Sequence, residues 1–516
     1  MFVTDQTLPP IVRGEIQPWT DRNPTGGPVL AAFLADLLPA SAGRILVAGP
    51  HDTDVLELAA SRAGEVTVLL RSVSDAEALR GGKYTVVTGA LDGLAEAVTT
   101  PFDVVIAADG LDRLLGPDSP ALDWPERAAL LRGLAAPGAT VVIGVENGFA
   151  VTGLLDRRPE KDRYGDDEWR PLHDDPRRPA SAAQAEAALG GATRRFALFA
   201  PDRRVHTMIE SDAVGRTHPG FPGARIALAG LAAQTSATPL LAPVTTAAEA
   251  AARAGLLDTV APGWLVVLGP AGETHTAYLP SGAADLTADG WRLGDRLVPD
   301  AESAETVLFR FAAAEDVPGF RAFAARLGAL EDVAFFDEIH DFVAAPFAAT
   351  GRSKAEMLAA AWHRFRDRLI GEHRRHPWPP WMADGDDLVK TWLAMSGVEP
   401  TADLLKYGRE IVDEAFPAAE QPDLRAALAD AEAAQLKIKE QAGHIFGLER
   451  TMRFRDQQLR TREQQLRNMR DEMRRFKAGK VVKVASVVGR VARLRDPKRL
   501  AGAVKKRARK FLPGRS

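Results

Sequence analysis

The chain has 516 residues, of which 46% are apolar, with 65 Lys and Arg against 69 Asp and Glu and no cysteine. This length and apolar content predict about two to four domains with buried cores. The lack of cysteine excludes disulfides, thiolate catalysis and cysteine-ligated metals, and it fits a cytoplasmic protein. We expect neither a signal peptide nor a membrane-spanning helix, because no basic run precedes an apolar one and no stretch of about 18 apolar residues occurs.

A leader of residues 1–28 precedes the first expected helix, and Pro and Gly mark its end. Residues 29–215 then alternate short apolar runs with segments of helical spacing. The runs are RILVAG, EVTVLL, YTVVTG, FDVVIAAD and ATVVIGV, which begin at Arg44, Glu65, Tyr84, Phe102 and Ala139. Such runs suit strands that are buried on both faces. Their alternation with helices predicts a parallel α/β sheet.

The polar, Pro-rich segment 156–180 is long for an internal loop, so we expect a lid or a binding segment there. Residues 181–215 return to helix and strand and are expected to close the first domain. Residues 216–330 contain alternating runs that begin at Trp264, Thr274 and Trp291. These runs predict antiparallel strands in a small α+β domain.

Residues 331–416 are helical and aromatic in pattern. His363, His373 and His376 are close in sequence, but no neighbouring carboxylate ligands are obvious. A metal site needs several such ligands at suitable spacing. We therefore expect no metal, and we expect packing roles for the aromatic side chains around these histidines.

A long helix is expected at 424–476, because apolar residues recur there every seven positions without a break. This stripe consists of Ala431, Ile438, Ile445, Met452, Leu459, Leu466 and Met473. The companion positions are mostly polar, namely Gln435, Ala442, Glu449, Asp456, Glu463 and Arg470. The pattern predicts a coiled coil and a homo-oligomer, with a solvated single helix as the alternative.

Residues 477–516 form a basic tail with seven Lys, seven Arg and one Asp, a net charge of +13. The rest of the chain must carry −17 to give the total of −4. Within the tail, basic and Val residues fall on separate helical stripes, which is typical of a helix that lies in a membrane interface. We expect the tail to meet an anionic membrane. Nucleic acid could bind it by charge alone, but the Val stripe favours the membrane.

The order of RILVAG, FDVVIAADGLDRLL and LLRGLAAPGATVVIGVENGFAV resembles class I S-adenosylmethionine-dependent methyltransferases over about residues 30–215. The resemblance implies a Rossmann-like domain with S-adenosyl-L-methionine as cofactor. With the coil and the tail, the whole chain is similar to bacterial methyltransferases that modify surface polysaccharides. That similarity implies O-methylation of a cell-surface glycan or its precursor at the cytoplasmic membrane face. A catalytically inactive, methyltransferase-like scaffold that oligomerises and docks on the membrane is the alternative.

The resemblance places the ligand outside the carboxyl ends of the strands. The cofactor-binding residues that it implies are Gly49, Asp52, Arg71, Asp92 and Asp109. Candidate catalytic bases are Asp109 and His51, although an Asp at a strand end can also cap a helix.

The sequence departs from the family pattern at three places in this site. Pro50 follows the single glycine of the first loop, and Arg71 and Ala90 stand where acidic residues are expected. Asp92, two residues after Ala90, can serve as a replacement. An Arg after the second strand also suits the 2′-phosphate of a different nucleotide, so a site for another ligand stays open.

Overall fold

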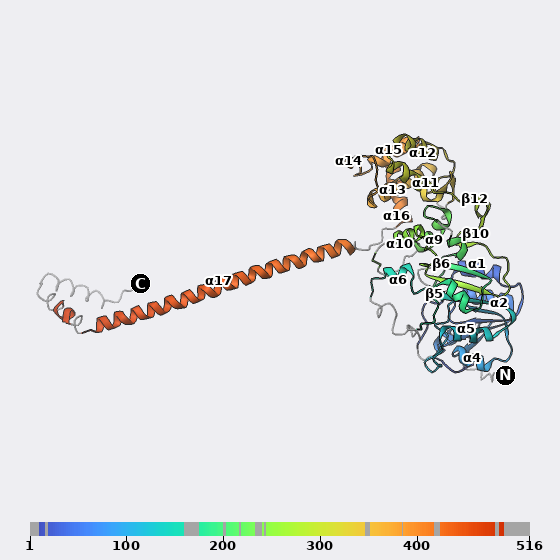
Figure 1. Cartoon of the computed structure of the whole chain (residues 1–516), viewed down its shortest axis with the longest axis horizontal. Helices are drawn as coiled ribbons and strands as arrows, with labels where there is room; N and C mark the ends of the chain where they lie inside the picture. Colours follow the sequence, from blue (N-terminus) through green and yellow to red (C-terminus); the bar gives the residue numbers. More distant parts are fainter. Residues whose placement is uncertain are drawn as a thin grey trace, which may run out of the picture. The chain divides into compact units, whose positions relative to one another are not determined.

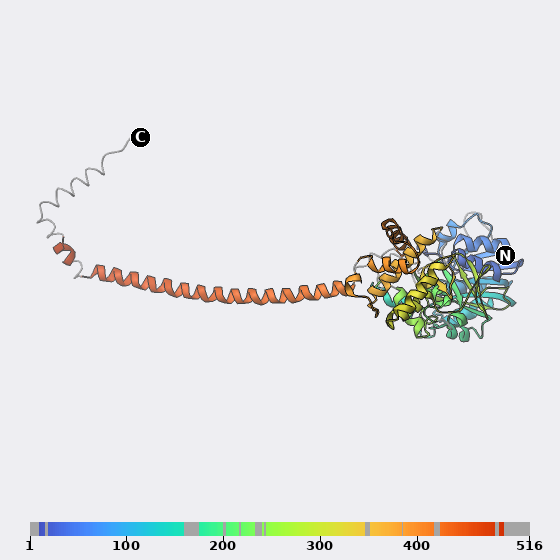
Figure 2. The same cartoon turned by 90° about the horizontal axis from the view of Figure 1, so that it is seen from above.

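The computed structural model divides into two compact units, Met1–Gln421 and Pro422–Ser516. The first unit is built on a 12-stranded sheet and the second on a long helix (Figures 1 and 2). The structure describes residues 10–15, 19–158, 175–199, 203–215, 218–232, 240–241, 244–345, 351–383, 385–416, 424–479 and 484–489.

Five parallel strands form one half of the sheet, in the order β3-β2-β1-β4-β5. They are β1 (Ala42–Ala48), β2 (Ala63–Leu70), β3 (Thr85–Thr88), β4 (Phe102–Ala107) and β5 (Ala135–Glu146). This is the strand order of a doubly wound nucleotide-binding sheet. The α/β, Rossmann-like fold expected from the sequence is therefore confirmed.

Each face of the sheet has its own apolar core, because successive side chains of a strand point to opposite faces. In β1, Ile45 and Val47 join one core and Leu46 and Ala48 the other. The first core is covered by α1 (Pro28–Leu37), α2 (Thr53–Arg62) and α3 (Val73–Ala78). The second is covered by α4 (Leu91–Ala97), α5 (Trp124–Gly133), α7 (Ala182–Ala188), α9 (Pro222–Ala232) and α10 (Val244–Arg253). Two short helices, α6 (Val151–Leu155) and α8 (Ser211–Gly215), complete this part.

The other half of the sheet is antiparallel and continues from β5 in the order β8-β6-β7-β9-β10-β11-β12. Its strands are β6 (Arg194–Phe199), β7 (Thr207–Glu210), β8 (Gly263–Leu268), β9 (Ala277–Leu279), β10 (Gly282–Thr287), β11 (Gly290–Leu293) and β12 (Arg296–Val298). The strands expected in 216–330 are thus present and antiparallel. They do not form a separate small domain, because β8 lies between β5 and β6 and pairs with both. The expected boundary at residues 215 and 216 is therefore absent.

A group of helices stacks beyond the antiparallel strands (Figure 1). Its helices are α11 (Ala304–Ala313), α12 (Val317–Ala329), α13 (Lys354–Gly371), α14 (Pro380–Ala383), α15 (Asp387–Met395) and α16 (Ala402–Ala415). A short hairpin of β13 (Ile339–His340) and β14 (Val343–Ala344) precedes α13. The core of this group is aromatic, with Phe320, Trp362, Phe365 and Trp392 in mutual contact. The helical character expected for 331–416 is present, and the group begins earlier, at Ala304.

His363 lies inside this helical group and is hydrogen bonded rather than free. Its Nε2 donates to the Leu405 carbonyl at 3.0 Å, and its Nδ1 accepts from Arg409 at 3.0 Å. No group of three or more His, Asp or Glu side chains that could hold a metal ion occurs among the described residues.

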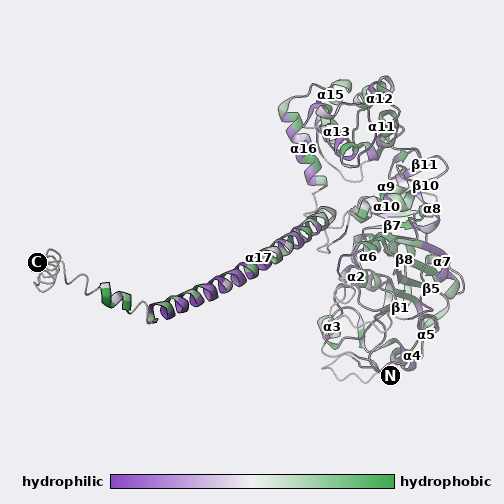
Figure 3. Ribbon diagram, turned by 60° about the vertical axis from the view of Figure 1, so that its left-hand side comes forward, coloured by the Kyte–Doolittle hydropathy of each residue, from purple (hydrophilic) through white to green (hydrophobic). Residues whose placement is uncertain are grey.

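The largest described element of the second unit is α17 (Leu424–Ala478), which has 55 residues. Figure 3 shows most of this helix as hydrophilic, with hydrophobic residues interspersed. The stripe residues from Ile438 to Met473 are 51% to 65% exposed. Leu448, Met469 and Phe476, which follow the stripe by three positions, are exposed as well. The exposed apolar surface of α17 is thus wider than the stripe. It extends on the flank of the stripe that faces away from the mostly polar companion positions. The coiled coil itself stays a prediction.

Most of the basic tail lies outside the described residues, as does 159–174 of the expected lid. Residues 484–489 are helical, and Val484 and Val488 of the predicted Val stripe are exposed. Within the described parts of the chain, no helix is both long enough and apolar enough to cross a membrane.

The position of β8 predicts that a fragment of residues 1–215 will not fold, whereas residues 1–421 will. Without β8, the inner edge of β5 and the facing edge of β6 lack their hydrogen-bonding partner, and unpaired edges promote aggregation. Urea denaturation followed by near-ultraviolet circular dichroism checks this. We expect a cooperative transition for 1–421 only, and a cooperative transition of 1–215 would contradict the prediction.

For the second unit, we predict self-association through the apolar stripe. Replacing Ile445 and Leu459 together by Lys places two charges in the seam and should give a monomeric helix in sedimentation of residues 424–478. The control replaces Gln457 and Gln464 by Lys, which adds the same charge on the opposite face and should leave association intact. A monomer before any substitution would leave the single solvated helix as the correct description.

Candidate functional site

The carboxyl ends of β1 to β4 meet at one edge of the sheet, where ligands of open α/β sheets bind. Residues 10–15 and 19–27 of the leader run across this edge, and we call them the strap. The Val12 N–H donates to the Thr88 carbonyl at 2.7 Å, at the end of β3. The Asp52 N–H donates to the Thr25 carbonyl at 3.0 Å, just beyond β1. The strap is therefore hydrogen bonded to the edge near both of its ends.

Gly49 follows β1 with a φ of 90°, a conformation that favours glycine. Asp52 caps α2, because its carboxylate accepts the Val55 N–H at 3.2 Å. The same carboxylate accepts the Gly27 N–H of the strap at 2.6 Å. The first loop is thus shaped as expected, but the acidic group of this loop is used by the protein itself.

His51 lies in this loop and is buried. Its Nδ1 donates to the Gly49 carbonyl at 3.0 Å, which leaves the lone pair on Nε2. Nε2 has no hydrogen-bond partner among the described residues. Burial lowers the pKa of the His51 imidazole, so the ring is neutral near pH 7.

Asp109 follows β4 and accepts several hydrogen bonds at the edge. Its carboxylate accepts from Arg113 Nε at 2.8 Å, from Arg203 Nη1 at 2.9 Å and from the Thr25 hydroxyl at 2.6 Å. The side chains of Asp109 and Arg113 are both 0% exposed. Burial alone would raise the pKa of Asp109, but Arg113 and Arg203 hold it well below its usual range. In this arrangement Asp109 is a poor proton acceptor, and its role as a base stays a prediction.

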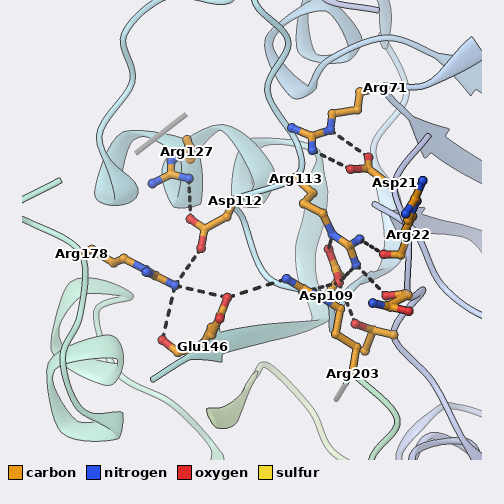
Figure 4. Close-up of polar contacts among 12 residues, drawn as sticks. Asp21, Arg22, Arg71, Asp109, Asp112, Arg113, Arg127, Glu146, Arg178 and Arg203 are labelled. Carbon is orange, nitrogen blue, oxygen red and sulfur yellow. Dashed lines mark hydrogen bonds and ion pairs between the residues drawn. The ribbon is translucent and has the colours of Figure 1, made fainter. Parts of the chain in front are cut away.

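Arg71 follows β2 and is paired with Asp21 of the strap (Figure 4). The two guanidinium to carboxylate hydrogen bonds measure 2.8 Å at Nε and 2.6 Å at Nη2. Arg71 also donates to the Leu115 carbonyl at 3.2 Å. The Asp75 carboxylate accepts the Asp21 N–H at 2.7 Å, and burial raises the pKa of Asp75. An acidic side chain thus lies near the end of β2, four residues after Arg71.

Asp92 lies in the first turn of α4 and is buried. Its carboxylate pairs with Arg13 of the strap at 2.8 Å and accepts the Ser119 hydroxyl at 2.7 Å. The structure therefore brings together at one edge all six residues singled out in the sequence. They are Gly49, His51, Asp52, Arg71, Asp92 and Asp109. Their roles in binding and catalysis stay predictions, because the carboxylates and the guanidinium of this set are all held by neighbouring groups.

Further arginines extend the network towards the end of β5 (Figure 4). Arg178 contacts Asp112 at 2.8 Å and Glu146 at 3.8 Å. Arg203 contacts Glu146 at 3.7 Å, and Arg127 contacts Asp112 at 3.0 Å. The edge of the sheet is thus filled by alternating positive and negative groups.

Sequence reasoning missed Asp21, Asp75, Arg113 and Arg203. Arg113 lies in the run DGLDR, only four residues after Asp109, so the short spacing was a usable signal. Asp21 is 50 residues from Arg71, and Arg203 is 94 residues from Asp109. No local sequence pattern predicts pairs at such a separation.

Two described cavities lie elsewhere. A groove of about 760 Å³ is bounded by α4 and α5 and reaches Pro101 and Ala135, next to the starts of β4 and β5. A cavity of about 240 Å³ lies among Arg296, Glu331 and Arg352 of the antiparallel and helical parts. Neither is lined by residues of the carboxyl edge, which the strap crosses.

No protein-family model and no curated protein matches the sequence. Among solved structures, the chain is similar to the N-methyltransferase NodS of Bradyrhizobium japonicum WM9 in complex with S-adenosyl-L-homocysteine, at 17% identity over 23% of this chain and 59% of that one, with a TM-score of 0.18. The methyltransferase CcbJ of Streptomyces caelestis is 25% identical over 23% of this chain and 49% of its own, with a TM-score of 0.18. Phospholethanolamine N-methyltransferase 2 of Haemonchus contortus is 13% identical over 49% of this chain and 52% of its own, with a TM-score of 0.25.

The chain thus spans between about half and three fifths of each of these solved methyltransferases.

The buried pair at the edge gives a stability prediction. Asp109→Asn leaves Arg113 and Arg203 facing a neutral group, and breaking a buried pair in this way costs about 3–5 kcal/mol of unfolding free energy. The control is Asp387→Asn, which removes an exposed pair with Lys390 and should cost less than about 1 kcal/mol. Urea denaturation of the full chain measures both. Equal losses in the two variants would contradict the prediction.

Proposed function

We propose that this chain is an S-adenosylmethionine-dependent methyltransferase that O-methylates a cell-surface glycan or its precursor at the cytoplasmic membrane face. The observation that carries the proposal is the parallel half-sheet with a glycine turn after β1 and candidate ligand residues gathered at its carboxyl edge. Ligands of doubly wound sheets bind at this edge. The sequence resemblance over residues 30–215 supports the choice of cofactor.

When bound, S-adenosyl-L-methionine supplies an activated methyl group. The protein must hold the acceptor hydroxyl in line with that group and remove its proton. His51 is better suited to accept the proton than Asp109, because its Nε2 lone pair is unpartnered among the described residues and its imidazole is neutral. The Arg113 and Arg203 pairs make Asp109 a positioning group for the strap and the loop after β4.

Cofactor binding at this edge requires part of the strap to move. Residues 19–24 of the strap contact the edge through the Asp21 to Arg71 pair and through two carbonyls that accept from Arg113. The outer side of this stretch is exposed, including Trp19. Opening of this stretch breaks the buried Asp21 to Arg71 pair, so the free energy of ligand binding must offset that loss. With that compensation, the edge can bind a cofactor after a local opening.

The long helix α17 and the basic tail that follows it fit a membrane-bound oligomer. In the proposal, the stripe of α17 joins copies of the chain, and the net charge of +13 in residues 477–516 attracts an anionic bilayer. The exposed Val484 and Val488 add an apolar contribution that salt does not screen. Flotation of the full chain with anionic and with neutral liposomes tests this docking.

A second candidate function is the catalytically inactive scaffold. The buried ion pairs at the edge favour it. Arg71 and Asp92 are paired with strap residues, and Asp109 is paired with an arginine of its own loop. In this case the coil and the tail would gather partners at the membrane without any methyl transfer.

Calorimetric titration of the full chain with S-adenosyl-L-homocysteine separates the two candidates. For the enzyme, we expect binding heat and about 2.7 kcal/mol of added stability at 100 times the dissociation constant. His51→Gln should keep this binding but lower methyl transfer to a glycan acceptor by about 100-fold or more. The control is His218→Gln, far from the edge in sequence. Neither heat nor a thermal shift at saturating ligand would leave the scaffold as the function.

A further inference from the structure

The end of β2 is basic, whereas an adenosyl ribose is usually met there by an acidic residue. In doubly wound sheets, an acidic group at this place accepts the ribose hydroxyls, and an Arg accommodates a phosphate on the ribose. Arg71 is the residue that follows β2 here, and its side chain is 2% exposed. A guanidinium buried to this degree requires an anionic partner.

A carboxylate that pairs with Arg71 in this structure comes from the strap. Asp21 meets the guanidinium with both carboxylate oxygens, in the parallel two-bond geometry that Arg also forms with phosphate. The Asp21 side chain is itself only 5% exposed. A carboxylate thus lies where a phosphate of a bound nucleotide would meet Arg71.

A second guanidinium faces the same stretch of the strap. Arg113 donates through Nη1 to the Arg22 carbonyl at 2.6 Å and through Nη2 to the Asn23 carbonyl at 3.1 Å (Figure 4). Movement of residues 21–23 away from the edge would therefore remove strap acceptors from both arginines. Backbone carbonyls and one carboxylate are groups that phosphate oxygens can replace.

We propose that Arg71, assisted by Arg113, binds the 2′-phosphate on the ribose of an adenine nucleotide. In the closed state, the Asp21 carboxylate occupies the place of that phosphate. The ligand displaces Asp21 and opens residues 19–24 of the strap. This proposal goes beyond the proposed function, since it concerns an anionic ligand and does not require methyl transfer.

The test is calorimetric titration of the full chain with adenosine 2′,5′-bisphosphate and, in parallel, with adenosine 5′-monophosphate. The two probes differ only in the 2′-phosphate. We expect the bisphosphate to bind at least tenfold more tightly. Asp21→Asn removes the internal competitor, so it should tighten bisphosphate binding by a further tenfold or more, because a larger fraction of the chain is open. The charge-matched control is Asp118→Asn on an exposed loop, which should change nothing.

Arg71→Gln should abolish the preference for the bisphosphate. Because this variant leaves Asp21 without its partner, the double variant Asp21→Asn with Arg71→Gln serves as the folded reference, since it removes both charges together. Equal binding of the two probes by the unchanged chain, or no tightening in Asp21→Asn, overturns the proposal and leaves an internal ion pair only.

S-Adenosyl-L-homocysteine carries no phosphate, so its titration does not report the preference for a 2′-phosphate. Binding of S-adenosyl-L-homocysteine without any preference for the bisphosphate would keep the proposed function and overturn this inference. The reverse result would keep the inference and remove the methyltransferase proposal.

Discussion

The ion pairs around Asp109 are the interaction on which the arrangement of the carboxyl edge depends. One carboxylate holds Arg113 from its own loop, Arg203 from the segment before β7, and Thr25 from the strap. Three stretches of chain that are far apart in sequence are thereby tied to the end of β4. Since a buried charge is costly without partners, none of these stretches can move alone without exposing or compensating it.

The same kind of interaction attaches the helical group to the sheet. Arg225 of α9 pairs with Asp337 and Glu338, and Arg368 of α13 pairs with Glu249 of α10. Buried pairs of this kind add little net stability compared with apolar packing, but their geometry is directional. The aromatic core around Trp362 supplies the packing, whereas the ion pairs fix how the two layers meet.

The fold was largely predictable from sequence because buried parallel strands read as continuous Val, Ile and Leu runs. The run from Arg44 and the run from Phe102 became β1 and β4 for that reason. The pairing of β8 with β5 and β6 was not predictable, because the sequence WLVVLGP fits a strand of a separate domain as well as a strand of the central sheet. At the site, Arg71 and Asp109 were found because strand ends are locally recognisable. Asp21 was missed because its bond to Arg71 spans 50 residues.

The place of β8 also sets an order of events during synthesis of the chain. β5 and β6 are complete once residue 199 has been made, yet the strand that joins them ends at Leu268. At about 5–20 residues per second, translation leaves these two edges unpaired for several seconds. The nascent chain must therefore keep the edges of β5 and β6 unpaired and soluble until β8 has been made, a demand that the finished protein does not meet.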